Sequence, residues 1–219
     1  MTASLIDRLL AIEVSALCDA DKTLPVADPA IRAMVPDVRF AGPAFTVQAL
    51  DDHLPVLSAL AEAQAGDVLV IASCGGTVAV FGELFATEAK RRGLAGIVTD
   101  GFCRDVAGLR SLALPAYARG TLPRSGTTVS RAPLNAPVRF GGLDVAPGDL
   151  VFGDDDGLVI APPAQIEAAL ELGEAIGRAE GAILQHTRSG QRSLHELTNW
   201  ESHVAALDRG EESSLGFDV

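Results

Sequence analysis

Apolar positions follow two different periods in the first part of the chain. Near the N-terminus they recur at helical spacing, which predicts a helix over residues 3–18. Continuous apolar runs at 67–73 and 94–99 predict strands that are buried on both faces of a sheet. Around these runs, the pattern predicts helices over 54–65, 78–92 and 105–112, and further strands at 38–49 and 115–119.

The second half of the chain has a different character. Residues 120–150 are rich in Gly, Pro, Thr and Val, which is typical of short strands joined by turns. Residues 20–38 contain three prolines and are expected to be mostly irregular. After two adjacent prolines, a long helix is predicted over 164–186. The short strands are expected at 138–140, 143–145, 150–152 and 158–161, with a turn at 153–157.

Strands that alternate with helices and then give way to a β-rich half predict the α/β class. A length of 219 residues is that of one ordinary domain with a tail. We expect one catalytic domain over residues 1–189 and a polar, acidic C-terminal arm or tail over 190–219. Such an arm could lie over a neighbouring subunit, or the segment could be partly disordered.

The composition narrows the class of protein. The 17 basic and 29 acidic residues give a formal charge of −12, which argues against direct nucleic-acid binding. No run of about 18 apolar residues predicts a membrane helix, and Asp7, Arg8 and Glu13 interrupt any signal peptide. Three widely spaced cysteines favour a reducing compartment. We therefore expect a cytoplasmic protein without a membrane partner.

Glu83, Arg104 and Asp105 form the pattern that most suggests chemistry. The carboxylate of Glu83 precedes the Arg-Asp pair by 21 positions (104 − 83). A predicted helix, a Gly turn and a buried strand lie between them, and this layout can bring a helix start and a strand end together. Arg can grip a carboxylate through two parallel hydrogen bonds, and Asp can hold a hard divalent cation. Together they suit metal-assisted chemistry on a 2-oxo acid.

The same residues also have structural interpretations. A Glu in the first turn of a helix is favoured by the helix dipole. Asp105 could cap the next helix, with Arg104 pairing at the surface. The functional interpretation gains weight from position, because ligands of α/β proteins gather beyond the carboxyl ends of strands. A helix start at Gly82 would also present free N–H groups to an anion.

Other candidate residues carry weaker signals. Lys22 and Lys90 are the only lysines, which disfavours a Schiff-base mechanism. Three adjacent carboxylates at 154–156 more often form a solvated turn than a cation site. Cys103 is interpreted as a small buried residue, and His53 as a surface histidine rather than a base.

These residues lie in stretches that resemble the regulator of ribonuclease activity A-like (RraA-like) family. That family includes class II 4-hydroxy-4-methyl-2-oxoglutarate and 4-carboxy-4-hydroxy-2-oxoadipate aldolases. The resemblance covers about residues 5–188 and implies a swivelling β/β/α-type domain, assembled as a homotrimer or hexamer with active sites between subunits. The matching stretches are FAGPAFTV at 40–47, AGDVLV at 65–70, GEL at 82–84, GLAGIVTDGFCRD at 93–105, PGD at 147–149 and GDDDG at 153–157.

In the family's aldolases, an Asp, then twenty intervening residues, then Arg-Asp marks the active site. Arg104 and Asp105 match this motif, whereas Glu83 stands where the aldolases have Asp. The resemblance implies that Asp105 binds Mg²⁺ or Mn²⁺ and that Arg104 binds the substrate's carboxylate or carbonyl oxygen. It also implies a pyruvyl-binding set of backbone amides, those of Gly82, Glu83, Leu84 and Phe85.

Two glutamates complete the implied site. Glu180, in the predicted long helix, matches a family glutamate that reaches a neighbouring subunit's metal through water. A solvated helix glutamate is the alternative interpretation of Glu180. Glu83 is likewise expected to act on the metal through water.

The implied function is a divalent-metal-dependent lyase that cleaves 4-hydroxy-2-oxo acids by a retro-aldol step and releases pyruvate. Oxaloacetate decarboxylation is an expected side activity, because both reactions pass through the same enolate. One alternative is a non-enzymatic regulator that binds a ribonuclease or another protein through its acidic surface. Another is a different oxo-acid enzyme on the same scaffold.

Overall fold

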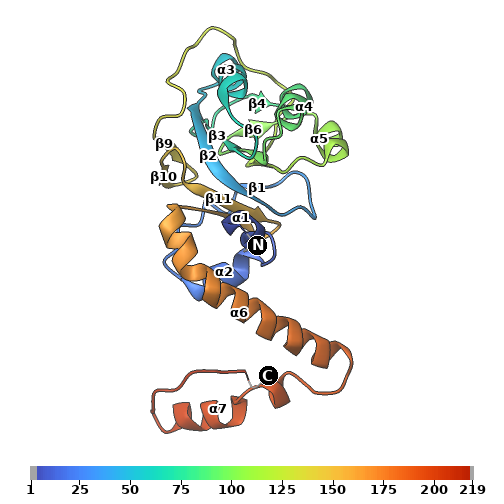
Figure 1. Ribbon diagram of the computed structural model, residues 1–219, viewed down its shortest axis with the longest axis vertical. Helices are drawn as coiled ribbons and strands as arrows, with labels where there is room; N and C mark the ends of the chain where they lie inside the picture. Colours follow the sequence, from blue (N-terminus) through green and yellow to red (C-terminus); the bar gives the residue numbers. More distant parts are fainter. Residues whose placement is uncertain (1–3, 218–219) are drawn as a thin grey trace.

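The computed structural model describes residues 4–217 and shows a body with a helical arm below it (Figure 1). The body is built on a seven-stranded sheet. Its strands are β1 (Arg32–Ala33), β2 (Phe40–Gln48), β3 (Val68–Ala72), β5 (Gly96–Thr99), β7 (Ala116–Ala118), β11 (Leu150–Asp154) and β12 (Gly157–Ala161). Their order is β1-β7-β5-β3-β2-β11-β12. The four strands β7, β5, β3 and β2 run parallel, and the others pair antiparallel with their neighbours.

A second, smaller sheet continues the first. Its three strands are β4 (Ala79–Phe81), β6 (Phe102–Cys103) and β8 (Gly120–Thr121), in the order β4-β6-β8 and all parallel. Along the chain, β3 leads to β4, β5 leads to β6, and β7 leads to β8. The carboxyl ends of these short strands therefore meet at one edge, where ligands of α/β proteins commonly bind.

Helices cover one face of the large sheet, and a hairpin covers the other. The helices are α3 (Leu54–Glu62), α4 (Glu83–Arg91) and α5 (Val106–Leu112), and the hairpin pairs β9 (Val138–Phe140) with β10 (Leu143–Val145). In β3, Leu69 and Ile71 belong to the helix-side core, whereas Val68 and Val70 pack in the hairpin-side core. All four side chains are fully buried, which confirms a strand buried on both faces.

The N-terminal segment forms two short helices, so the prediction of one helix over residues 3–18 is wrong. Helix α1 (Leu5–Leu9) and helix α2 (Val14–Ala20) are separated by a turn. The break has a tertiary cause, because the N–H of Val14 donates to the buried carboxylate of Asp154, 2.9 Å away. That bond fixes the start of α2 beside the end of β11.

The predicted helix over 78–92 is also partly wrong. Residues 79–81 form strand β4, and α4 begins only at Glu83. Val80 and Phe81 suit a strand, since β-branched and aromatic side chains pack well on a pleated surface. Both are buried in the helix-side core.

The acidic run at 154–156 is only partly the solvated turn that its composition predicts. Asp154 belongs to β11 and is buried, and it pairs with Gly157 of β12. Asp155 and Asp156 alone form the exposed turn. Asp154 therefore serves the fold, because its carboxylate accepts hydrogen bonds from the N–H groups of Val14 and Asp156.

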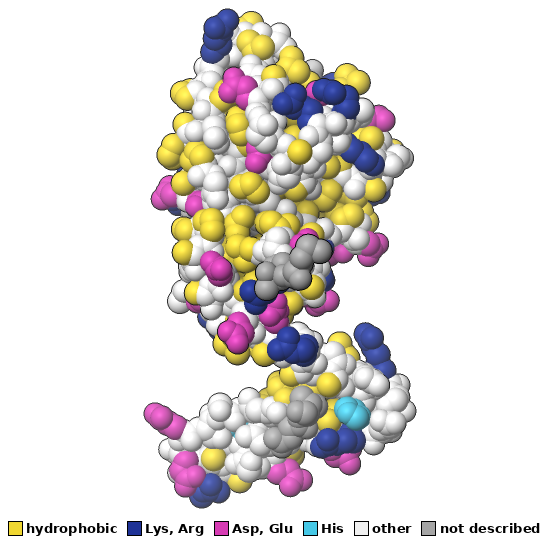
Figure 2. Space-filling model, in the orientation of Figure 1, with side chains coloured by type: hydrophobic (Ala, Val, Ile, Leu, Met, Phe, Trp, Pro, Cys, Tyr) yellow, Lys and Arg dark blue, Asp and Glu magenta, His cyan; other side chains and the backbone are white. Residues whose placement is uncertain are grey.

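The C-terminal part extends away from the body. Helix α6 (Pro163–Arg188) packs on α2 and then continues past the body to the arm, which contains the 3-10 helix η1 (His195–Leu197) and helix α7 (Trp200–Asp208) (Figure 1). The described part of residues 190–219 is therefore a folded arm. Apolar side chains of the arm remain exposed (Figure 2), among them Leu194, Trp200, Leu215 and Phe217. None of the helices within residues 4–217 has the length and apolar character needed to cross a membrane.

Candidate active site

The candidate site forms where β4 and β6 end side by side. Phe81 pairs with Cys103 in the small sheet, and the N–H of Arg104 donates to the carbonyl oxygen of Phe81 over 3.1 Å. The residues that follow each strand, Gly82 and Arg104, are therefore adjacent. This explains the spacing along the sequence, because α4 and β5 form the crossover that returns the chain to the neighbouring strand.

The carboxylate of Asp105 is turned toward the start of α4. Its Oδ2 atom accepts a hydrogen bond from the N–H of Glu83 at 3.3 Å and lies 3.4 Å from Nε of Arg104. Asp105 precedes α5 with a left-handed backbone (φ 58°) and does not cap that helix through its side chain. Such a conformation is costly for a non-glycine residue and is often found at functional sites. Its side chain remains 43% exposed, so lone pairs are open to a ligand.

Gly82 allows this close approach. A Cβ atom at residue 82 would lie 2.5 Å from Oδ2 of Asp105 and 2.8 Å from Cγ of Arg104. The backbone of Gly82 is extended (φ −159°), a conformation open to any residue. Glycine is therefore required here for space, and any larger residue would displace one of the two charged side chains.

A small cavity of about 50 Å³ opens at this point. Arg104 and Asp105 line it together with Gly82, Leu84 and Phe85 from the first turn of α4. The first N–H groups of a helix have no partner within the helix, so this turn presents donors and a positive dipole end to an anion. The cavity thus combines a guanidinium, a carboxylate and free backbone donors. The complete lining is His53, Phe81, Gly82, Leu84, Phe85, Arg104 and Asp105.

The side chain of Glu83 lies outside this cavity. A Cβ atom at Gly108 of α5 would overlap the carboxyl group of Glu83, so that carboxyl group packs directly against Gly108. Glu83 is exposed, and its link to the other site residues is its backbone N–H, which donates to Asp105. A role for the Glu83 carboxylate through water stays a prediction.

His53 belongs to the cavity lining, although its sequence context suggested a surface histidine. Its ring meets Phe85 edge-on, with centroids 5.9 Å apart. The N–H of Gly126 donates to Nε2 of His53 at 2.8 Å. The only local signal was the sequence Asp-Asp-His before a helix, and nothing in it indicates proximity to residues 82 and 104.

Asp52 holds the neighbouring loop against His53. The buried carboxylate of Asp52 accepts hydrogen bonds from the hydroxyl of Thr127 at 2.6 Å and from the N–H groups of Val129 and Ser130 at 2.9 and 3.0 Å. Burial by itself would raise the pKa of Asp52, but these hydrogen bonds outweigh it and hold that pKa well below its usual range. The loop over 126–130 is thereby fixed beside the cavity.

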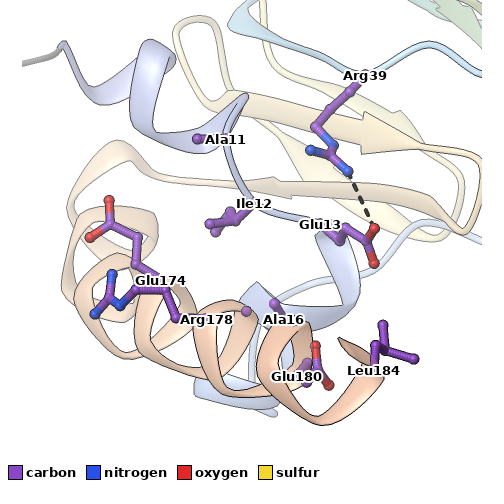
Figure 3. A pocket seen from close by; sticks show the side chains of 11 residues that line it. Ala11, Ile12, Glu13, Ala16, Arg39, Glu174, Arg178, Glu180 and Leu184 are labelled. Carbon is purple, nitrogen blue, oxygen red and sulfur yellow. Dashed lines mark ion pairs between the residues drawn. The ribbon is translucent and has the colours of Figure 1, made fainter. Parts of the chain in front are cut away.

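Glu180 lies in a different place in the same chain. It points toward a cavity of about 460 Å³ between α6 and the segment that joins α1 to α2 (Figure 3). Arg39 and Glu13 face each other across one side of this cavity, with Nη2 and Oε1 3.7 Å apart. The structure of one chain therefore does not bring Glu180 to Asp105. Its approach to a neighbouring subunit's metal stays a prediction from the resemblance.

A metal ion at this site would rest on few protein ligands. Within residues 4–217 no three His, Cys, Asp or Glu side chains gather in a way that could hold a metal. The open carboxylate of Asp105 nevertheless fits Mg²⁺ or Mn²⁺, because such ions are often held by one or two carboxylates and keep several waters or substrate oxygens. Asp105 is the residue that would anchor the ion.

The fold and the candidate site together define an α/β protein in which an Arg-Asp pair and the start of a helix meet beyond short parallel strands. The RraA-like family, described as Aldolase/RraA, matches residues 5–160. The chain therefore belongs to the RraA-like family, and its fold is that of RraA proteins.

Three similar proteins carry different names. A Halalkalibacterium halodurans protein named "Putative 4-hydroxy-4-methyl-2-oxoglutarate aldolase" is 36% identical over 168 residues, covering 76% of this chain and 80% of that protein. The structure of an S-adenosylmethionine: 2-dimethylmenaquinone methyltransferase from Geobacillus kaustophilus is 31% identical, with a TM-score of 0.65 and coverage of 69% and 95%. The RNA-processing inhibitor RraA from "Thermus thermophilis" is 26% identical, with a TM-score of 0.63 and coverage of 74% and 94%.

Proposed function

We propose that this protein is a divalent-metal-dependent lyase that cleaves 4-hydroxy-2-oxo acids and releases pyruvate. The observation that carries the proposal is the convergence of Arg104, Asp105 and the open N-terminus of α4 on one cavity. The similarity to a protein named as an aldolase supports the same reaction class. The methyltransferase name is not supported by the sequence, which lacks a glycine-rich nucleotide-binding fingerprint.

At the 2-oxo acid end of the substrate, different residues bind the carboxylate and stabilise the developing charge. The backbone N–H groups of Leu84 and Phe85, at the positive end of α4, bind the carboxylate next to the 2-oxo group. The guanidinium of Arg104 then faces the 2-oxo oxygen, where negative charge develops as the bond between C3 and C4 breaks. The 4-hydroxyl loses its proton to give a carbonyl product, and C3 gains a proton to give pyruvate.

Asp105 would hold Mg²⁺ or Mn²⁺ at the same end of the substrate. When bound, the ion supplies Lewis-acid polarisation of the 2-oxo group. The ring of Phe85, which meets His53 of the cavity lining edge-on, would limit the water around the developing charge. Decarboxylation of oxaloacetate forms the same enolate, so we propose it as a side activity of the same residues.

Assembly and location complete the proposal. We propose a homotrimer or hexamer, as the resemblance to the family implies, and Leu84, which is 78% exposed beside the cavity, is an apolar residue that such an interface would cover. Light scattering after size-exclusion chromatography checks this, and a monomer at micromolar concentration would contradict it. The three cysteines are free thiols, which fits a cytoplasmic, reducing location.

The test is release of pyruvate from 4-hydroxy-4-methyl-2-oxoglutarate and from oxaloacetate, with Mg²⁺, with Mn²⁺ and with EDTA. We expect turnover that requires a metal and that is lost in the Asp105→Ala variant. Asp156→Ala removes an exposed carboxylate from the β11–β12 turn and serves as the matched control, with unchanged turnover. Full activity in EDTA or in Asp105→Ala would contradict the proposal.

A second candidate function is a non-enzymatic regulator that binds a protein partner. It is favoured by the structural similarity to the RNA-processing inhibitor RraA and by the net charge of −12. Its support would be capture of a ribonuclease together with no lyase turnover on either substrate. The two functions are separated by Arg104→Lys, because this change keeps the charge but removes bidentate binding and lowers only the lyase activity.

A further inference from the structure

We propose that His53 is a specificity-determining residue of the same cavity, and this assignment rests on the proposed lyase function. In this role its Nδ1–H group donates a hydrogen bond to an oxygen on the half of the substrate that leaves as the carbonyl product. The favoured ligands then carry a second carboxylate on that half. The assignment follows from the position, the tautomer and the fixed setting of the ring.

The position of His53 separates it from the groups that hold the 2-oxo acid end. Arg104 and Asp105 come from the end of β6, and the amide donors come from the first turn of α4. His53 enters the same cavity from the loop before α3. A substrate held at its 2-oxo acid end by the first two elements would meet His53 with its remaining atoms.

The tautomer of His53 follows from its hydrogen bond. Nε2 accepts from the N–H of Gly126 at 2.8 Å, so in the neutral ring the proton is carried by Nδ1. Within the described residues, no protein group accepts a hydrogen bond from Nδ1 of His53, and the ring's one hydrogen bond is the one that Nε2 accepts from Gly126. The free Nδ1–H is a donor, which suits binding of an oxygen atom and does not suit removal of a proton.

The ring is held in place before any ligand arrives. The N–H of His53 donates to the carbonyl oxygen of Thr127 at 2.8 Å, and the N–H of Thr127 donates to the carbonyl oxygen of Asp51 at 3.0 Å. A Cβ atom at Gly126 would overlap the carbonyl group of Asp51, so only glycine brings its N–H this close. A donor fixed in this way loses little freedom on binding, which favours discrimination between ligands.

Two substitutions of His53 distinguish the roles of its two ring nitrogens. Asn places a polar atom near the position of Nδ1 and abandons the bond to Gly126. Gln places an acceptor near the position of Nε2, which keeps the bond to Gly126 and abandons the donor at Nδ1. A role in substrate recognition and a role in holding the loop therefore predict opposite rankings of the two variants.

The experiment compares kcat and KM on 4-hydroxy-4-methyl-2-oxoglutarate, which has the second carboxylate, and on 4-hydroxy-2-oxopentanoate, which lacks it. We expect His53→Gln to lower kcat/KM for the first substrate roughly tenfold to a hundredfold, mainly through a higher KM, because one charge-assisted hydrogen bond is lost. The kcat/KM for the second substrate should stay at the wild-type value. We expect His53→Asn to stay within a few-fold of the wild type. His203→Gln, in the exposed arm, is the matched control.

The outcomes distinguish this assignment from the proposed function. Equal activity of wild type and His53→Gln on both substrates overturns the assignment and leaves the lyase function standing. A loss in Asn but not in Gln, with a lower melting temperature, also overturns it and gives His53 a structural role. If the wild type shows no turnover, the lyase proposal fails. In that case, the affinities for 2-oxoglutarate and pyruvate, measured by calorimetry, test the role of His53. The wild type must bind 2-oxoglutarate more tightly than pyruvate, and the His53→Gln variant must lose this preference.

Discussion

Oδ2 of Asp105 accepts a hydrogen bond from the backbone N–H of Glu83, 3.3 Å away, so one carboxylate links the starts of two helices. Asp105 precedes α5, and Glu83 opens α4. The bond uses one of the free donors of α4 and leaves the next ones to a ligand. The geometry of the candidate site therefore depends on how closely the ends of β4 and β6 approach each other.

Replacing Gly82 with Ala tests whether the site needs β4 and β6 to end so close together. The new methyl group would collide with Asp105 and Arg104, which are partly exposed and can move aside. We expect at least about a tenfold loss of kcat, because small displacements of positioned groups are costly for catalysis. The extended backbone tolerates alanine, so the circular dichroism spectrum should stay unchanged.

Gly181→Ala is the control for that prediction. Gly181 lies in α6, and a Cβ atom there would meet nothing within 4 Å. Alanine is the better helix former by about 1 kcal/mol, so this variant should unfold at a slightly higher temperature with unchanged turnover. Wild-type activity in Gly82→Ala would show that the close approach is not needed.

Replacing Gly108 with Ala tests the position of the Glu83 side chain. The new Cβ atom must displace the carboxyl group of Glu83 from α5, which an exposed side chain can accommodate. We expect several-fold lower pyruvate release, with stability equal to the wild type or higher by up to about 1 kcal/mol. The double variant with Glu83→Ala should show no loss beyond Glu83→Ala alone. Additive losses would mean that Gly108 acts independently of Glu83.

The depressed pKa of Asp52 predicts a pH dependence of stability. Its carboxylate stabilises the folded state above the pKa of the unfolded chain, about 3.9, and this contribution is lost as the pH falls toward the lower folded pKa. The melting temperature of the wild type should therefore fall relative to Asp52→Asn as the pH is lowered from 6 to 3. A constant difference between the two proteins over this range would contradict the prediction.

The cysteines should differ sharply in reactivity. Burial raises the pKa of the Cys103 thiol to about 12, whereas Cys74 is exposed. Because the thiolate is the reactive form, iodoacetamide at pH 8 should modify Cys74 and leave Cys103 unmodified until the protein unfolds. Peptide mass spectrometry before and after addition of urea measures this. Early modification of Cys103 would show that the small sheet opens in the native state.

Much of the sheet could be predicted from the sequence. The strands at 67–73 and 94–99 have continuous apolar runs, and the structure contains them as β3 and β5. The small sheet could not be predicted, because β6 and β8 have only two residues each and β4 has three. Such lengths are too short to show a period. The two helices at the N-terminus could not be predicted either, because the start of the second helix depends on the carboxylate of Asp154, 140 positions away.

The candidate site, too, could be predicted from the sequence only in part. Arg104 and Asp105 follow a buried strand, and their proximity to Gly82 follows from the crossover between parallel strands. His53 depends instead on a loop 73 positions further along the chain, which Asp52 holds in place. Its placement is a tertiary effect with no local period or motif.

The loop over 126–130 is attached to the body chiefly through the three residues 51–53. The residues proposed to bind the 2-oxo acid end lie at the end of β6 and in the first turn of α4, outside this loop. If the proposed lyase function holds, engineered changes in this loop should alter the choice of substrate and leave Arg104, Asp105 and the start of α4 in place. Gly126 and the hydroxyl of Thr127 would have to be kept, because they attach the loop to residues 52 and 53.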